Sequence, residues 1–143
     1  MHSALMLAKY IVHYCHKNDG TISGRKLQRV LYLIQVLVIR YGGEAVFRDP
    51  ICLTSFGLAI PVVHEEFRLL YMLQIPQDYD ECTYLPLTES SEWKLINNLV
   101  REVALLPQSK IDEMVEYDKA YQNARKRGLK IITPEMIKIQ EKI

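Results

Sequence analysis

The feature that most constrains the fold is a nearly continuous aliphatic stretch early in the chain. Between Val30 and Ile39 only a tyrosine and a glutamine interrupt a series of leucine, isoleucine and valine residues. A helix of this composition is apolar around most of its circumference, so it has no wide face to offer to solvent. Ser23 is a favourable N-cap residue, and the glycines of "YGG" at 41–43 favour a helix end. We therefore predict a helix from Ser23 to Arg40 that other elements surround.

About five further helices are expected to pack around this central helix. Each is indicated by apolar residues at helical spacing and by a capping residue, a proline or a glycine at its ends. The expected ranges are 4–17, 61–74, 88–107, 109–128 and 133–143. Between the second and third helices, "AVFRDPICLTSF" at 45–56 carries β-forming residues without a helical period. The predicted fold is mainly α, a compact bundle of about six helices with a small two-strand β element.

Two local expectations follow from this assignment. The helix over 61–74 is expected to bury an apolar face made of Val63, Phe67, Leu70 and Leu73. The helix over 109–128 is expected to begin at Ser109, whose hydroxyl is a suitable cap, and to stop at Gly128.

The charge balance and length bound the class of protein. A chain of 143 residues is in the range of one domain, which we expect to span 1–143. Eighteen lysines and arginines against seventeen acidic residues leave a formal charge of +1, which argues weakly against a dedicated nucleic-acid binder. No apolar run approaches the length of a membrane span, and three widely spaced cysteines are typical of reduced thiols. We expect a cytoplasmic protein without membrane contact.

No pattern of metal ligands or catalytic residues predicts an enzyme. In "HYCH" at 13–16 the two histidines share a helix face, but Cys15 points elsewhere and no second ligand pair follows. None of the cysteines lies in a nucleophile motif, and no phosphate-binding loop is present. His64, Glu65 and Glu66 are the one candidate for acid–base chemistry, although carboxylates at the start of a helix are already explained by the helix dipole. We predict no metal, no cofactor and no catalytic residue, with a hydrolase as the least favoured alternative.

Three cations open the central helix and need an explanation. Arg25, Lys26 and Arg29 lie in its first turns, where the positive end of the helix dipole makes a cation unfavourable unless an anion is nearby. The anion has three candidate sources: this chain itself, an acidic partner protein, or a nucleic-acid phosphate. The intramolecular candidates are Glu65, Glu66, Asp78, Asp80 and Glu81. A DNA-recognition helix is disfavoured, because such a helix keeps one solvated face along its length.

Two stretches resemble a known family. "ISGRKLQRVLYLIQVLVIRYGGEAVF" resembles the opening helix and turn of the Panacea domain, also described as the SocA-like antitoxin domain of phage-associated proteins. The matching residues are Lys26, Leu27, Gln28, Leu31, Tyr32, Gln35, Tyr41 and Gly42. "LTSFGLAIPVVHEEF" is similar to the family's second signature, with Phe56, Gly57, Pro61, Val63 and Phe67 in register. Thr54, Leu58 and the pair Ala120–Tyr121 depart from the family pattern, so the chain resembles a divergent member.

The resemblance implies a helical fold and a role in binding another protein. We expect a non-enzymatic interaction module, antitoxin-like or phage-associated, that neutralises or escorts a partner protein by direct contact. An aromatic anchor with flanking charge is the usual form of such recognition. The candidate partner-binding residues are Arg25, Lys26, Arg29, Tyr32, Tyr117 and Tyr121. A DNA-binding transcriptional regulator is the alternative from another class.

Overall fold

The predicted central helix is the element around which the fold is built. Helix α2 spans Gly24–Gly42, and Ser23 is its N-cap, whose hydroxyl accepts a hydrogen bond from the Lys26 backbone N–H. Gly43 follows the last turn in the left-handed conformation, at φ 85°, which glycine adopts without a steric penalty. Both ends of this helix therefore agree with the sequence prediction.

The fold is mainly α, as predicted, with a small antiparallel sheet. The computed structural model describes residues 2–79 and 91–140. Within these ranges the other α-helices are α1 (Ala4–Lys17), α3 (Pro61–Phe67), α4 (Ser91–Val103), α5 (Gln108–Glu116), α6 (Lys119–Lys126) and α7 (Pro134–Gln140). A 3₁₀ turn, η1 (Arg68–Leu70), follows α3 directly. The strands are β1 (Ile51–Thr54), β2 (Gly57–Ala59) and β3 (Ile131–Ile132).

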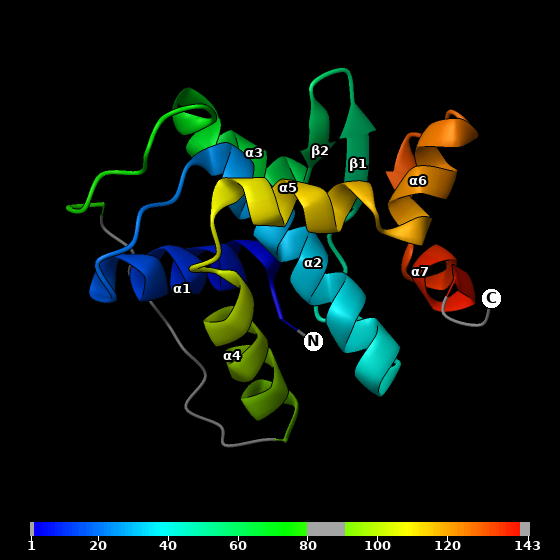
Figure 1. Ribbon diagram of the computed structural model, residues 1–143, viewed down its shortest axis with the longest axis horizontal. Helices are drawn as coiled ribbons and strands as arrows, with labels where there is room; N and C mark the ends of the chain where they lie inside the picture. The colour runs from blue at the N-terminus through cyan, green and yellow to red at the C-terminus, as the bar shows by residue number, and fades with distance from the viewer. Residues whose placement is uncertain (1, 80–90, 141–143) are drawn as a thin grey trace.

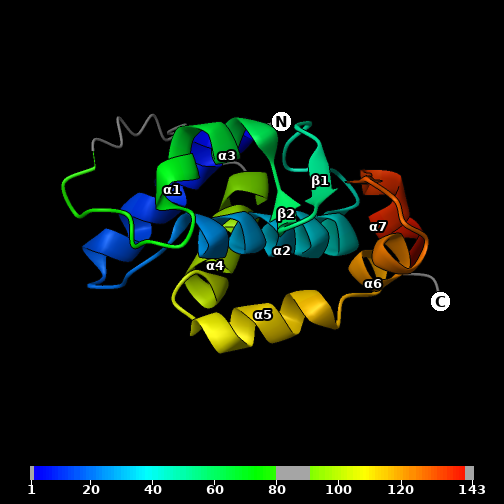
Figure 2. The same cartoon turned by 90° about the horizontal axis from the view of Figure 1, so that it is seen from above.

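Helix α2 is covered on several sides. In Figures 1 and 2 it runs through the middle of the molecule, with α3 and the β1–β2 hairpin on one side and α5 on the opposite side. Helices α1, α4 and α7 also contact it. Its residues Leu27, Val30, Leu31 and Ile34 have no exposed surface at all. The aliphatic stretch is thus the core of the protein, as its composition predicted.

Two glutamines within α2 form hydrogen bonds to neighbouring chain segments. Gln35 accepts a hydrogen bond from the Val46 backbone N–H at 2.7 Å and donates to the Phe47 carbonyl at 3.0 Å. Gln28 accepts from the Ile60 backbone N–H at 2.8 Å, just before α3 begins. Buried amides of this kind satisfy backbone groups that have no partner in a helix or sheet. The two glutamines of α2 are therefore the points at which the segments around Val46 and Ile60 are hydrogen-bonded to the helix.

Within the described residues the sheet has three strands where two were predicted. Strand β1 lies inside the predicted range 45–56, β2 follows it directly, and β3 comes from much later in the chain. Strand β1 is central in the order β2–β1–β3, and both pairings are antiparallel. The third strand pairs Ile132 with Ile51 from a distance of about eighty residues in sequence. A two-residue strand of this kind has no periodic pattern of its own, so only the tertiary fold defines it.

The predicted helix over 109–128 is two helices, which raises the number of α-helices to seven in the described ranges. The chain breaks at Tyr117, and Asp118 starts α6 as an N-cap that accepts a hydrogen bond from the Tyr121 backbone N–H. The same carboxylate accepts a hydrogen bond from the Tyr32 hydroxyl at 2.6 Å. Long-range bonding of Asp118 to α2 therefore favours the break over a continuous helix. Gly128 ends α6 at φ 68°, as predicted.

Other predicted boundaries need smaller corrections. Helix α3 gives way to η1 after Phe67, and Leu73 is 61% exposed, so the predicted apolar face stops short of it. Ser109 is not the cap of α5, since Pro107 occupies the N-cap position and provides no side-chain hydrogen bond. The predicted start of the fourth helix at Thr88 lies outside the described residues. None of the helices in the described ranges is both long and apolar enough to cross a membrane.

Candidate functional site

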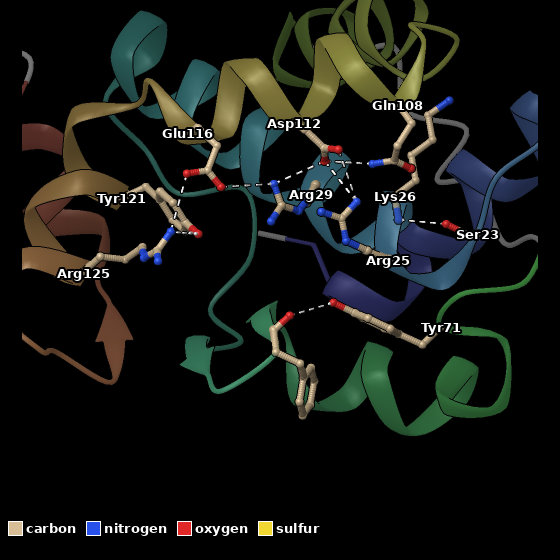
Figure 3. A network of polar contacts seen from close by, with 11 residues as sticks. Ser23, Arg25, Lys26, Arg29, Tyr71, Gln108, Asp112, Glu116, Tyr121 and Arg125 are labelled. Atoms are coloured by element: carbon tan, nitrogen blue, oxygen red, sulfur yellow. Dashed lines mark hydrogen bonds and ion pairs between the residues drawn. The ribbon is translucent and has the colours of Figure 1, made fainter.

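The cations that open α2 lie against an acidic face of α5. Arg25 Nη1 contacts the two carboxylate oxygens of Asp112 at 3.1 and 3.4 Å, and Arg29 Nη1 lies 3.3 Å from Asp112 Oδ1. Glu116, one turn further along α5, places Oε1 3.9 Å from Arg29 Nη1. Figure 3 shows these side chains facing one another between the two helices. The arginines and the acids are each spaced by four residues, so each pair shares one helix face.

The intramolecular anion for these cations is therefore on α5. The sequence analysis placed it at Glu65 or Glu66, or at Asp78, Asp80 or Glu81, and those assignments are wrong wherever the structure describes the residue. Glu65 instead pairs with Arg68 at 3.8 Å, and Glu66 accepts a hydrogen bond from the Tyr79 hydroxyl at 2.7 Å. Asp80 and Glu81 lie outside the described residues.

A third arginine, Arg125, extends this network to α6 and borders a cavity. Arg125 Nη1 lies 3.5 Å from Glu116 Oε2, and its guanidinium stands 5.5 Å above the centre of the Tyr121 ring. We call the adjoining hollow of about 280 Å³ the arginine cavity. Its lining comprises Arg29, Glu116, Tyr121, Arg125 and the segment 53–57 of the β1–β2 hairpin. Arg25, Arg29 and Arg125 carry three positive charges against two on Asp112 and Glu116, so the network has a surplus of positive charge.

The tip of the hairpin joins this cavity to a group of aromatic rings. The Tyr71 hydroxyl donates a hydrogen bond to the Phe56 carbonyl at 3.2 Å, and the two rings are 5.6 Å apart. Phe56 also stacks on His64, with ring centres 5.4 Å apart. Gly57 follows at φ 117°, a conformation that only glycine adopts readily, close to the Arg29 guanidinium. The turn thus holds Phe56 at the boundary between charged and aromatic side chains.

Large apolar side chains beside this aromatic group are open to solvent. Leu69 is 83% exposed, Met72 74% and Leu73 61%, and Phe56 at the hairpin tip is 52% exposed. We call these four residues the apolar ridge. Single exposed apolar residues are ordinary, but a cluster of them next to a polar rim is typical of an interaction surface.

The structure separates the six predicted partner-binding residues into accessible and inaccessible ones. Tyr32 is fully buried, so its predicted contact with a partner is wrong. Its hydroxyl instead donates a hydrogen bond to the Asp118 carboxylate. Lys26, Arg29 and Tyr121 are at most 8% exposed, although each lines a cavity. Arg25 is half-buried in its ion pair with Asp112, and Tyr117 is 72% exposed at the corner between α5 and α6.

Sequence reasoning missed the residues that the site adds. Leu73 was assigned to a buried face, while Leu69 and Met72 carried no signal, because nothing local shows that α3 ends at Phe67. Asp112 and Glu116 did carry a signal. Their spacing matches that of Arg25 and Arg29, and the two pairs form a complementary set for antiparallel or crossing helices.

The residues considered for acid–base or metal chemistry are dispersed among other contacts. His64 stacks on Phe56, while Glu65 and Glu66 bind Arg68 and Tyr79 respectively. In "HYCH", Cys15 is in the core, and its thiol lies 3.7 Å from the Ala104 carbonyl. Burial raises the pKa of this thiol to about 11, which keeps it protonated and unreactive.

No protein-family model, curated protein or solved structure matches this chain. The fold and the site define a small, mainly helical protein that carries an exposed apolar ridge beside a cavity lined by arginines.

Proposed function

We propose that this protein is a non-enzymatic interaction module that binds a partner protein through the apolar ridge and the neighbouring arginine cavity. The partner segment would place apolar side chains against Leu69, Met72 and Leu73 and an acidic side chain beside Arg29 and Arg125. The resemblance to the Panacea domain supports an antitoxin-like role, in which the bound partner is a cytoplasmic toxin or another effector.

The exposure of the apolar ridge is the observation that carries this proposal. Burying one leucine or methionine side chain contributes about 1.5–3 kcal/mol, so the three on η1 and the following turn represent several kcal/mol of unused binding free energy. Association costs about 4–15 kcal/mol in lost freedom of motion, so these anchors need support from further contacts. The arginine cavity, which meets the ridge at Phe56, is suited to provide them.

The charge of the cavity favours an acidic partner group. Arg29 Nη1 is buried and makes only long contacts to Asp112 and Glu116, at 3.3 and 3.9 Å. Glu116 is 48% exposed in its side chain and therefore free to turn toward solvent. A partner carboxylate in its place would have two guanidinium groups within reach, which is the arrangement that charge-assisted recognition favours.

The DNA-binding alternative finds less support in the geometry. The cations of α2 face α5 rather than solvent, and α2 itself is enclosed by its neighbours. A helix in this position cannot enter a major groove without dismantling the core.

The test is co-expression with the product of the neighbouring reading frame. We expect the wild-type protein to rescue growth if that product is toxic, and to co-purify with it. The variant Leu69→Ala/Met72→Ala/Leu73→Ala should fold normally, since these side chains are largely exposed, and should lose both effects. The control Ile139→Ala removes an apolar side chain that is 59% exposed on α7 and should retain them.

Two results would overturn the proposal. One is a complex that forms equally well with the triple variant. The other is absence of any complex together with salt-dependent binding of duplex DNA in a mobility-shift assay, which would favour the regulator instead.

A further inference from the structure

A second cavity lies at the opposite end of α5 from Glu116, and it shares no lining residue with the arginine cavity. It measures about 320 Å³, and its walls come from three segments far apart in the sequence. They are the turn at 19–21 between α1 and α2, Gln74, and the connection 105–108 that leads into α5. Lys26 from α2 completes the lining.

Lys26 is a buried cation that no described residue neutralises. It is 8% exposed, and its ammonium makes no ion pair or hydrogen bond within residues 2–79 and 91–140. Figure 3 shows its side chain extending beside Gln108 at the first turn of α5. Desolvation lowers the pKa of this ammonium, which records the free-energy cost of holding a charge there.

The start of α5 lines the same cavity through Pro107 and Gln108, and it has unused hydrogen-bond donors. Its N-cap is Pro107, which has no side-chain oxygen to accept a hydrogen bond. The backbone N–H groups of Lys110 and Ile111 bond to the Pro107 carbonyl, but those of Gln108 and Ser109 have no acceptor in the described part of the chain. Uncapped N–H groups at a helix start, aligned with the positive end of its dipole, are a known form of oxyanion site.

We propose that this cavity binds an oxyanion, a phosphate or carboxylate group of a small molecule, between the Lys26 ammonium and the free amides at the start of α5, where Gln108 lines the cavity and Ser109 is the next residue. Two independent features fit the same ligand: a buried lysine whose ammonium has no counter-charge among the described residues, and a helix start without a side-chain cap. The volume accommodates a phosphate or carboxylate together with a small remainder of the ligand. Asp19, exposed at the rim, limits the total negative charge that the ligand carries.

The experiment follows the backbone amide resonances of the full chain during titration with inorganic phosphate, and separately with acetate. We expect saturable shifts at Gln108 and Ser109. Lys26→Met should weaken binding about tenfold or more, because a charge-assisted contact is lost, and Lys26→Arg should retain part of it. The matched control is Lys110→Met, which removes a positive charge from the exposed side of the same helix and should leave the affinity unchanged.

The two anions distinguish the ligand class. Tighter binding of phosphate supports a phosphate ester as the natural ligand, and equal or tighter binding of acetate supports a carboxylate. The proposal is overturned if neither anion produces saturable shifts at these two amides, or if Lys26→Met binds as well as the wild type. Neither outcome bears on the apolar ridge, so this test and the co-expression test fail independently.

Discussion

Replacing Asp118 by alanine is expected to destabilise the protein strongly, because its carboxylate accepts three hydrogen bonds that join α2 to the start of α6. Its Oδ2 accepts hydrogen bonds from the Tyr32 hydroxyl at 2.6 Å and from the Tyr121 backbone N–H at 3.2 Å. Its Oδ1 accepts one from Arg40 Nη1 at 2.6 Å. The side chain of Asp118 is only 4% exposed, so water cannot replace it without opening the structure.

The magnitude follows from the three contacts. The buried Tyr32 hydroxyl loses its charged acceptor, which costs about 1.5–3 kcal/mol, and loss of the N-cap of α6 costs about 1 kcal/mol. Arg40 is 27% exposed in its side chain, so solvent recovers much of its contribution and about 1 kcal/mol remains. The sum is a loss of about 3–5 kcal/mol in the free energy of unfolding, or roughly 10–15 °C in Tm.

Urea denaturation followed by circular dichroism measures this loss, and a double-mutant cycle identifies its source. Tyr32→Phe alone should cost about 1–2 kcal/mol, and it should cost much less in the Asp118→Ala background, since the hydroxyl then has no acceptor to lose. The control Glu113→Ala removes an exposed carboxylate that pairs with Lys110 at 3.7 Å, and it should change stability by less than about 0.5 kcal/mol. A loss below about 1 kcal/mol for Asp118→Ala, or full additivity with Tyr32→Phe, would refute the reasoning.

Three further predictions concern single residues. Gly24→Ala should destabilise by about 1–3 kcal/mol, because its Cβ would lie 3.0 Å from backbone atoms of Leu70 and Tyr71, whereas Gly42→Ala, with open space around it, should be neutral or stabilising in the same urea titration. Burial raises the pKa of the Cys15 thiol from 9.0 in the unfolded chain to about 11 in the fold, so the thiol's contribution to stability should be full below pH 9 and decline above it. In thermal melts Cys15→Ala should therefore show a shallower decline of Tm between about pH 9 and 10 than the wild type. Lys26→Met should stabilise the fold by about 1 kcal/mol or more at neutral pH, since it removes a buried charge that has no partner within residues 2–79 and 91–140, and an unchanged or lower Tm would contradict that account.

The sequence was sufficient to predict an element of the fold where local chemistry and composition favour the same structure. Ser23 and Gly43 define the two ends of α2, and the aliphatic stretch between them could only be stable inside the protein. The mainly helical class follows from that one element together with the periodic segments around it. The break at Asp118 was not predictable, because the segment that contains it has helical propensity on both sides and the donors that bond to its carboxylate, Tyr32 and Arg40, lie some eighty residues away.

The functional surface was harder to predict than the core, for a physical reason. Burial is favourable for any apolar residue, so Leu73 was expected in the core. Its exposure depends on where α3 ends. The end of α3 is set by the pairing of Gln74 and Ile75 with the residues at the start of α2. Arg29 shows the reverse case, since a cation at a helix start was expected at the surface but lies under α5. In both cases a long-range contact overrides the local preference.

The same contacts explain why the apolar ridge and the arginine cavity lie together. The Arg25 backbone N–H donates to the Tyr71 carbonyl at 2.8 Å, and Gly24 leaves room for that segment to approach α2 closely. The turn that follows η1 is therefore fixed to the helix that supplies Arg29, and the Tyr71 hydroxyl in turn holds the hairpin tip through the Phe56 carbonyl. A partner that engages Leu69 and Met72 thus meets a cavity already in position, because both are attached to the first turns of α2. That rigidity reduces the ordering cost of binding, which is the main obstacle for a surface with only a few apolar anchors.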